Sequence, residues 1–542
     1  MFTLIKTHFF VFSILVIGLV LFLPTLSHGF VWDDEEQVVS NEAVHSFTNI
    51  PNLFAGSTFN SGGSGSLAGM YYKPMMSVAF AFLYSLSGGR AFLFHLFQIS
   101  LHIANALMIY LIFKSLFAKE KYGQWLSWWT GLVFLVHPLN VETAVYISAL
   151  QDVLYFFFGC LGLLLITRYR NLNNLILYPV LSCLLLLSLL SKETGIAWFF
   201  IIPIYYLLFD EKPKVIRNYS ILASYVFIFY LFLRFGIAKI DLYRGEGISP
   251  IMRVDFWQRI ISLPKILSYY LINFFFPFRL AIAQHWVVSV VNWSDFWRPL
   301  SFLSLIVVAT GWLFRLIKGQ KHLLLLGCFF TLWLLLGLGI HAQVFPLDMT
   351  VADRWFYFPM VGALGLMSLF LLKLFQKINS KKTVLFFSSL VILLLIIRSV
   401  IRIDNWQSGL SLFAHDITIS TDAFDLENNY GVELFRVGEF DQAKKHFARS
   451  TEIAPYWWSN WNNLGVAYQR EGDVETALEF YQTAMDHSDY YLAYQNYLGI
   501  LIGKKRLAEA ESFLREQALP KFPFNAQFLE ALKFLESQNY KP

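Results

Sequence analysis

Charged residues are scarce in this chain of 542 residues, where Asp, Glu, Lys and Arg make up 15%, against about 25% in soluble globular proteins. The hydrophobic fraction of 56% excludes a water-soluble enzyme over most of the length. It also excludes intrinsic disorder, which combines low hydrophobicity with high net charge. The net charge of +5 is small and scattered, so we expect no nucleic-acid partner. Only three cysteines occur, all in apolar runs, which predicts buried side chains rather than disulfides or a metal site.

Long apolar runs are what the sequence has in abundance. A membrane-spanning helix needs about 20 mostly apolar residues. The first run, 8–28, is long for a signal peptide and has no small-residue cleavage motif after it, which favours a retained span. Further runs are 93–116, 124–138, 146–167, 174–190, 195–209, 218–236, 301–316, 322–340, 355–374 and 383–400. We therefore expect an all-α, polytopic membrane bundle of about eleven spans. The short stretch 74–87 stays ambiguous, and 261–283 suits either a span or a re-entrant segment.

Lys and Arg gather in alternate loops, and such loops usually face the cytoplasm. The basic loops lie near 114–121, 168–170, 212–217, 318–321 and 373–382. All of them fall on one side if there are eleven spans and 261–283 does not cross. The opposite side then carries 29–73, 137–145, 191–194, 237–300, 341–354 and everything after 400. We expect the chemistry on this extracytoplasmic side.

The composition changes after Trp406, where charge rises and a repeat of 34 residues begins. Its glycines are Gly431, Gly465 and Gly499. The middle unit reads Trp461-x2-Leu464-Gly465-x2-Tyr468 and then Ala477-x3-Tyr481, which is the tetratricopeptide signature. We predict a membrane domain over 1–410 and a soluble α-solenoid over 411–542, with three repeats at about 420–517. Such a stack offers a concave face to a protein or peptide, or it only stabilises the membrane domain.

Titratable residues stand at span ends on the predicted extracytoplasmic side. Asp33 and Asp34 suit a proton acceptor or ligands for a divalent cation such as Mg²⁺ or Mn²⁺, but equally a solvated acidic loop. Lys73 offers a charge to a phosphate or anchors at the interface, and the Arg354 fork matches phosphate oxygens. Charged groups within or beside spans are usually functional or paired. Others of this kind are His137, Glu142, Asp152, Lys192 and Glu193.

These pieces occur in a specific order along the chain. A first span is followed by Trp32-Asp33-Asp34, Tyr72-Lys73-Pro74, His137-Pro138-x3-Glu142, Lys192-Glu193, Asp353-Arg354-Trp355-x-Tyr357-x-Pro359 and the repeats. The order resembles the transmembrane and tetratricopeptide repeat-containing O-mannosyltransferases, within the GT-C class of membrane glycosyltransferases. The resemblance covers about 29–200, 341–410 and 420–517. The chain departs from the family at Lys73, where Arg is common, at Leu150-Gln151, where Gly-Arg is usual, and at Asp353, which stands in the place of Glu.

The resemblance implies a GT-C bundle that moves a hexose, such as mannose, from a polyprenyl-phosphate donor to a protein or another extracytoplasmic acceptor. Asp33 or Asp34 would be the base, and Arg354, with Lys73, would neutralise the leaving phosphate. A direct displacement would invert the sugar. The supporting residues would be Tyr72, His137, Glu142, Asp152, Lys192 and Glu193. The implied partners are the sugar-bearing polyprenyl phosphate, the bilayer and a protein acceptor held in the tetratricopeptide groove.

Two other functions stay open at this point. The chain could be a transporter or flippase for a lipid-linked molecule, because intramembrane charges also mark such pathways. It could also be a non-catalytic membrane anchor that presents the repeats to a partner. We expect it in a bacterial inner membrane with the repeats on the periplasmic side.

Overall fold

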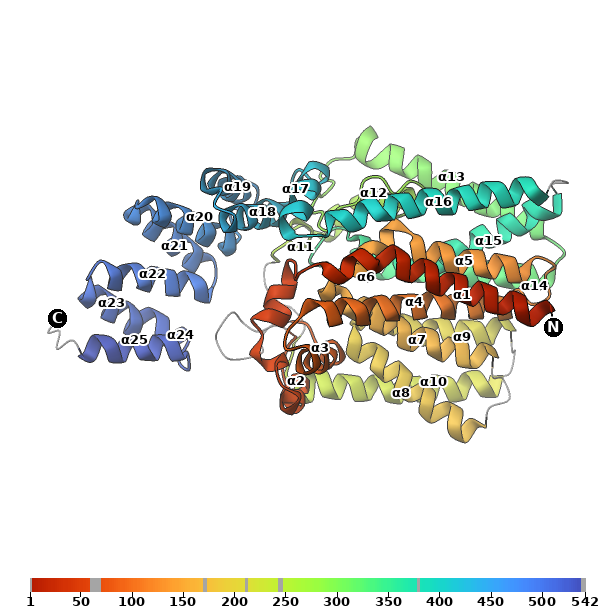
Figure 1. Cartoon of the computed structure of the whole chain (residues 1–542), viewed down its shortest axis with the longest axis horizontal. Coiled ribbons are helices and arrows are strands. Elements are labelled where there is room, and N and C mark those ends of the chain that lie inside the picture. Colours follow the sequence, from red (N-terminus) through yellow and green to blue (C-terminus); the bar gives the residue numbers. More distant parts are fainter. Residues whose placement is uncertain are drawn as a thin grey trace.

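The computed structural model describes residues 2–58, 70–168, 173–209, 213–241, 247–377 and 381–537. Helices make up the regular structure of this part of the chain, apart from a single isolated bridge between Gln284 and Val351. Figure 1 shows a bundle of long, roughly parallel helices with a curved helical arm at one end. The predicted all-α class, a membrane bundle followed by a solenoid, is confirmed.

Nine helices within the described residues are long and apolar enough to cross a membrane. They are built on α1 (Phe2–Phe22), α4 (Ala91–Leu116), α7 (Leu150–Arg168), α8 (Asn174–Ser191), α10 (Pro213–Leu231), α13 (Arg298–Ile317), α14 (Lys321–Ile340), α15 (Pro359–Lys377) and α16 (Lys381–Asn405). Two expected spans form shorter helices, α5 (Gly123–Val136) and α9 (Ala197–Phe209), which lie among the others in Figure 1. Pro138 stops α5 early, and the segment 137–149 that follows is buried throughout.

The predicted basic loops lie at the end of the bundle away from the arm. Lys373 Nζ, near the end of α15, donates to Gln320 Oε1 in the loop between α13 and α14 at 2.9 Å. The N-terminus is at the same end in Figure 1. The remaining basic loops fall partly outside the described residues, at 169–172, 210–212 and 378–380. We call the other end of the bundle the arm end.

The two ambiguous stretches both stay at the arm end. The helix α3 (Pro74–Ser87) lies there in Figure 1. Both ends of α12 (Phe256–Phe275) contact arm-end segments, since Arg259 Nε donates to the Gln343 carbonyl at 3.0 Å and His137 Nε2 lies 3.0 Å from the Phe274 carbonyl. A helix whose two ends meet the same side of the bundle does not cross it, so 261–283 is not a span.

The arm is built from helix pairs. They are α18 (Phe424–Arg436) with α19 (Phe440–Ile453), α20 (Trp458–Glu471) with α21 (Val474–His487), and α22 (Tyr491–Gly503) with α23 (Leu507–Phe513). The helix α17 (Gly409–Ile419) precedes them and α25 (Ala526–Ser537) follows. A Cβ at Gly431 would lie 2.6 Å from the Phe447 ring, and one at Gly465 would lie 2.7 Å from Tyr481. At Gly499 nothing lies within 4 Å. The two helices of a repeat therefore approach closely at the glycine in two of the three repeats.

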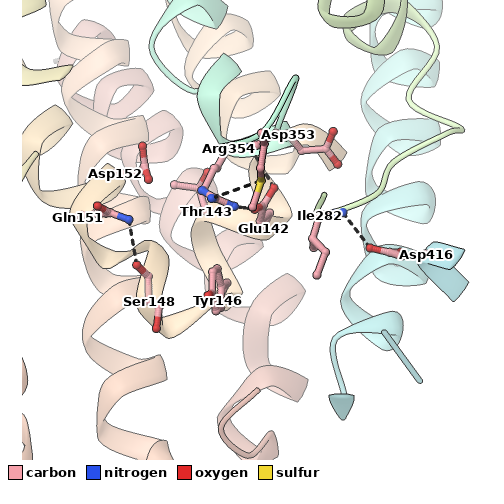
Figure 2. A network of polar contacts seen from close by, with 12 residues as sticks. Glu142, Thr143, Tyr146, Ser148, Gln151, Asp152, Ile282, Asp353, Arg354 and Asp416 are labelled. Atoms are coloured by element: carbon pink, nitrogen blue, oxygen red, sulfur yellow. Dashed lines mark hydrogen bonds and ion pairs between the residues drawn. The ribbon is translucent and has the colours of Figure 1, made fainter. Parts of the chain in front are cut away.

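A buried ion pair joins the arm to the bundle. Arg402 of α16 binds both carboxylate oxygens of Asp416 of α17, at 2.7 and 3.0 Å, and both side chains are at most 1% exposed. The Ile282 N–H also donates to Asp416 at 2.9 Å, as Figure 2 shows. The junction of α16 and α17 is thereby fixed to a segment that lies 134 residues earlier in the sequence.

The three cysteines are free, but they are not all buried. Cys160 is buried, Cys328 is half-buried and Cys183 is exposed on α8. The expectation of burial is wrong for Cys183, because an apolar run that crosses a bilayer also has a face that no other helix covers.

Candidate active site

The acidic loop after the first span turns sharply at Trp32. This residue has a φ of 59°, a left-handed conformation that is strained for a bulky side chain. Its ring stacks on Tyr146 with centroids 5.4 Å apart. Asp33 and Asp34 follow this turn directly and lie in different surroundings.

Asp34 is 1% exposed and is held by three donors. Its Oδ1 accepts from the Ser148 N–H at 2.8 Å and from the Ser148 hydroxyl at 2.6 Å, and its Oδ2 accepts from the Val31 N–H at 3.1 Å. Burial raises the pKa of Asp34 to about 7. Because both oxygens are engaged, Asp34 ties the acidic loop to the turn η6 (Ile147–Ala149) and acts as a positioning residue.

Asp33 is half-buried and meets a different set of groups. Burial raises the pKa of its carboxyl group, whereas the neighbouring Tyr146 hydroxyl and the charges of Arg354 and Lys73 lower that pKa. The Asp348 carboxylate raises it. Of the two aspartates, Asp33 is therefore the one that shares its surroundings with the predicted phosphate-binding cations.

Arg354 lies in the turn η10 (Asp353–Phe356), and Glu142 lies in α6 (Val141–Val145). Arg354 Nη1 pairs with Glu142 Oε1, and the Arg354 N–H donates to Glu142 Oε2 at 3.0 Å. In Figure 2 these two side chains face each other, while Asp353 points the other way. Within the described part of the chain, Arg354 Nη2 contacts only the Met349 sulfur, at 3.9 Å. The guanidinium thus keeps N–H donors for an anion.

Lys73 immediately precedes α3, is 7% exposed and forms no ion pair with any described residue. Its Nζ lies 4.1 Å from the centre of the Tyr71 ring, a favourable position for a cation. The Tyr71 hydroxyl donates to Asp348 at 2.8 Å. Burial lowers the pKa of Lys73 to about 8, so the ammonium group is still charged at neutral pH.

Two further ion pairs flank these groups. Lys192 Nζ lies 2.6 Å from Asp152 Oδ1, and both side chains are largely buried. The other Asp152 oxygen has no hydrogen-bond partner among the described residues. Glu193, the neighbour of Lys192, pairs with Arg234 at 2.7 Å. The charges of Glu193, Lys192 and Asp152 all act on the pKa of Lys73, which places both pairs beside it.

The remaining two predicted residues, Tyr72 and His137, make hydrogen bonds with the surrounding backbone. The Tyr72 hydroxyl donates to the Phe54 carbonyl at 3.1 Å, and the Tyr72 N–H donates to Glu193 at 3.4 Å. His137 Nδ1 accepts from the Leu139 N–H at 3.2 Å, and Nε2 faces the carbonyl of Phe274. Both ring nitrogens of His137 are therefore committed to the backbone.

Sequence reasoning missed four groups at this site. They are Tyr71, Tyr146, Arg234 and Asp348. Arg234 lies near the end of the apolar run 218–236 and resembles an interfacial anchor, yet it is 9% exposed and also donates to the Met70 carbonyl at 3.0 Å. The signal that could have found it is the acidic partner Glu193, since a buried charge needs an opposite one.

The paired aspartates do not suit a divalent cation. Both Asp34 oxygens accept N–H or O–H bonds, and the charges nearest Asp33 include the cations Arg354 and Lys73. Within the described ranges, no group of three or more His, Cys, Asp or Glu side chains could hold a metal.

Comparisons with known proteins agree with the motif order. A tetratricopeptide-repeat family model matches residues 459–486. A protein O-mannosyl-transferase of Caenorhabditis elegans is 24% identical over 447 residues, which cover 81% of this chain and 62% of that protein. For protein O-mannosyl-transferase TMTC3 of Homo sapiens the identity is 24% over 477 residues, with 81% and 51% covered.

A third relative, protein O-mannosyl-transferase TMTC4 of Homo sapiens, is 23% identical over 482 residues, which cover 80% of this chain and 64% of that protein. The chain spans about half to two thirds of the length of these curated relatives. The resemblance read from the motifs is confirmed: the chain is similar to protein O-mannosyl-transferases over about four fifths of its length and carries a tetratricopeptide repeat.

Proposed function

We propose that the protein is a membrane glycosyltransferase that moves a sugar, with mannose as the first candidate, from a polyprenyl-phosphate donor to a hydroxyl group of a protein. The observation that carries this proposal is that the charges of two cations, Arg354 and Lys73, both act on the carboxylate of the half-buried Asp33 at the arm end of the bundle. An acid beside cations suits a proton acceptor next to a leaving phosphate. The names of the relatives support the same class of reaction.

The proposed step is a single displacement. The acceptor hydroxyl oxygen forms a bond to the anomeric carbon, and Asp33 takes the hydroxyl proton. The bond between that carbon and the phosphate oxygen breaks, and its electron pair leaves with the polyprenyl phosphate. Arg354 and Lys73 stabilise the negative charge that develops on this phosphate. Attack from the side opposite the leaving group inverts the anomeric configuration.

The other site residues hold these groups in place. Glu142 fixes Arg354 through both its side chain and its backbone, and Asp34 fixes the loop that carries Asp33. The Asp152–Lys192 pair adds one more cation near Lys73. We propose that all of them are positioning residues.

We propose that the arm presents the acceptor to this site. Arg436 of α18 binds both carboxylate oxygens of Glu35, at 2.8 and 3.2 Å. Glu35 lies two residues after Asp33, so the first repeat touches the acidic loop. A peptide held along the arm would have a short path to the site.

The proposed location is a bacterial inner membrane with the arm in the periplasm. The basic loops at the opposite end of the bundle support the orientation, because such loops usually stay in the cytoplasm. The candidate site and the arm then share the extracytoplasmic side.

The test uses the full chain in nanodiscs with radiolabelled polyprenyl-phosphate mannose and candidate acceptor peptides. We expect transfer by the unmodified chain and a loss of about 10²–10⁴-fold in Asp33→Asn, the usual range for a general base. Glu42→Gln, an exposed carboxylate variant of the same loop, is the matched control and should keep full activity. Lipid-linked sugar that crosses the bilayer without transfer would indicate a flippase, and peptide capture without transfer would indicate a scaffold.

A further inference from the structure

A cavity lies at the arm end, outside the candidate active site. It has a volume of about 780 Å³ and is bounded by α12, the start of α13 and the segment that follows α17. None of Asp33, Lys73 and Arg354 lines it. Tyr269 of its wall donates to Asp353 at 2.5 Å, and Asp353 points away from Arg354 (Figure 2). The turn η10 therefore separates the cavity from the reaction centre.

The charges that face the cavity are mostly cationic. Lys265 is neutralised by Asp295 at 2.9 Å. Arg279 and Arg298 line the cavity, are exposed and make no ion pair or hydrogen bond with any residue that the structure describes. Asp422 is the remaining carboxylate of the wall. Two uncommitted guanidinium groups on one cavity suit a phosphate, which the Arg fork binds through paired hydrogen bonds.

The rim of the cavity is apolar and exposed. Phe276 and Phe278 line the cavity and are 63% and 67% exposed. Trp293 and Trp297, which immediately precede α13, are 69% and 49% exposed. Exposed aromatic side chains at the end of a spanning helix are typical of the interface between headgroups and hydrocarbon. The cavity thus opens at the depth where lipid phosphates lie.

An apolar groove lies beside the same end of α12. It has a volume of about 440 Å³ and is lined by Phe274 and Phe275, by α15 and by α16, including Leu395. The residue before Phe274, Asn273, lines the cavity. On α16, Arg398 lies one turn beyond Leu395 and donates to the Phe278 carbonyl at 3.2 Å. The end of α12 therefore borders both a charged compartment and an apolar compartment.

We propose that the two compartments hold one phospholipid of the surrounding bilayer, with its phosphate on Arg279 and Arg298 and a tail in the apolar groove. The polar–apolar division matches an amphipathic ligand, and the aromatic rim places the site against the bilayer. The bound lipid bridges α12, α13 and the base of the arm. This site is separate from the donor site of the proposed function, and it does not depend on that function.

The test is native mass spectrometry of the delipidated full chain with added phosphatidylglycerol. We expect the unmodified chain to retain this lipid and the double variant Arg279→Gln/Arg298→Gln to bind it about tenfold or more weakly, because two charge-assisted contacts are lost. Arg315→Gln, an exposed arginine at the other end of α13, is the matched control and should bind as the unmodified chain does. Equal thermal unfolding of all three proteins excludes a folding defect.

Separate additions of inorganic phosphate and polyprenyl phosphate distinguish the sources of the phosphate group. Retention of phosphatidylglycerol that a large excess of inorganic phosphate does not displace supports a lipid site. The proposal is overturned if the double variant keeps its lipid. It is also overturned if only polyprenyl phosphate or free phosphate binds at Arg279 and Arg298.

Discussion

At the scale of single residues, burial and partners decide what each of two adjacent aspartates does. Asp34 loses its contact with water and gains three donors, whereas Asp33 stays half-buried beside cations. The sequence leaves the base open between Asp33 and Asp34, because nothing in a Trp-Asp-Asp triplet predicts which carboxylate meets Ser148, 114 residues further along the chain.

Asp34→Asn should impair folding more than chemistry. An amide group can accept only at its oxygen, so one of the three donors loses its acceptor and the free energy of unfolding falls by about 1–3 kcal/mol. Thermal unfolding in nanodiscs measures the loss, and the transfer assay measures the rate per folded molecule. We expect a residual rate well above that of Asp33→Asn. The reverse order of the two rates would make Asp34 the base.

The pH dependence of transfer should show two limbs. Asp33 accepts a proton only when ionised, and burial raises its pKa, so activity should rise at a higher pH than for an ordinary aspartate. The pKa of Lys73 is lowered to about 8, so its charge is present below that pH and is lost as the pH rises through it. Donor affinity should fall about tenfold between pH 7 and pH 9, since the charged fraction falls by that factor.

The matched variant for this limb is Lys73→Arg, because arginine stays charged at all accessible pH values. The fall in kcat/KM near pH 8 should vanish in this variant, while the limb at lower pH should stay. If the fall near pH 8 persists in Lys73→Arg, another group causes it.

At the scale of helices, the sequence predicts where the helices lie along the chain better than it predicts where they end and which of them cross the bundle. The apolar runs locate the spans, and the repeat spacing locates the helix pairs of the arm. The runs do not reveal that α5 ends before the buried segment 137–149. Nor do they reveal that α12 turns both ends toward the same side of the bundle. Contacts with residues distant in the sequence, such as Gln343, determine these features, so local composition cannot predict them.

The arm offers a matched pair of glycines for testing its packing. Gly431→Ala would place a Cβ 2.6 Å from the Phe447 ring and 3.1 Å from the Ala443 carbonyl, which should cost about 1–3 kcal/mol as overpacking. Gly499→Ala meets nothing within 4 Å and should gain about 0.5–1 kcal/mol, because alanine suits a helix interior better.

Hydrogen exchange of the α18–α19 and α22–α23 amides in the full chain measures both glycine changes. Exchange should speed up in the first pair for Gly431→Ala and slow down in the second pair for Gly499→Ala. Equal effects at the two positions would mean that the repeats pack alike, against the geometry of the third.

At the scale of the whole molecule, the number of crossings sets which segments share a side. Nine long helices and the two shorter ones, α5 and α9, give eleven crossings for the described bundle. The loops after α4, α7 and α13 then lie on one side, and the arm lies on the other. The helix α5 has 14 residues, which is short for a span. If α5 did not cross, the loop after α4 would lie on the side of the arm.

Single cysteines decide this arrangement. In a chain whose own three cysteines are replaced by alanine, Lys119→Cys, Asn173→Cys and Lys318→Cys should react with a membrane-impermeant maleimide from one side of sealed vesicles. Glu530→Cys on α25 should react only from the other side. Lys119 follows α4, so its side relative to the arm depends on whether α5 crosses. Labelling of Lys119→Cys together with Glu530→Cys would remove α5 from the spans and place the loops of the candidate site on both sides of the membrane, where Asp33 and Arg354 could not meet.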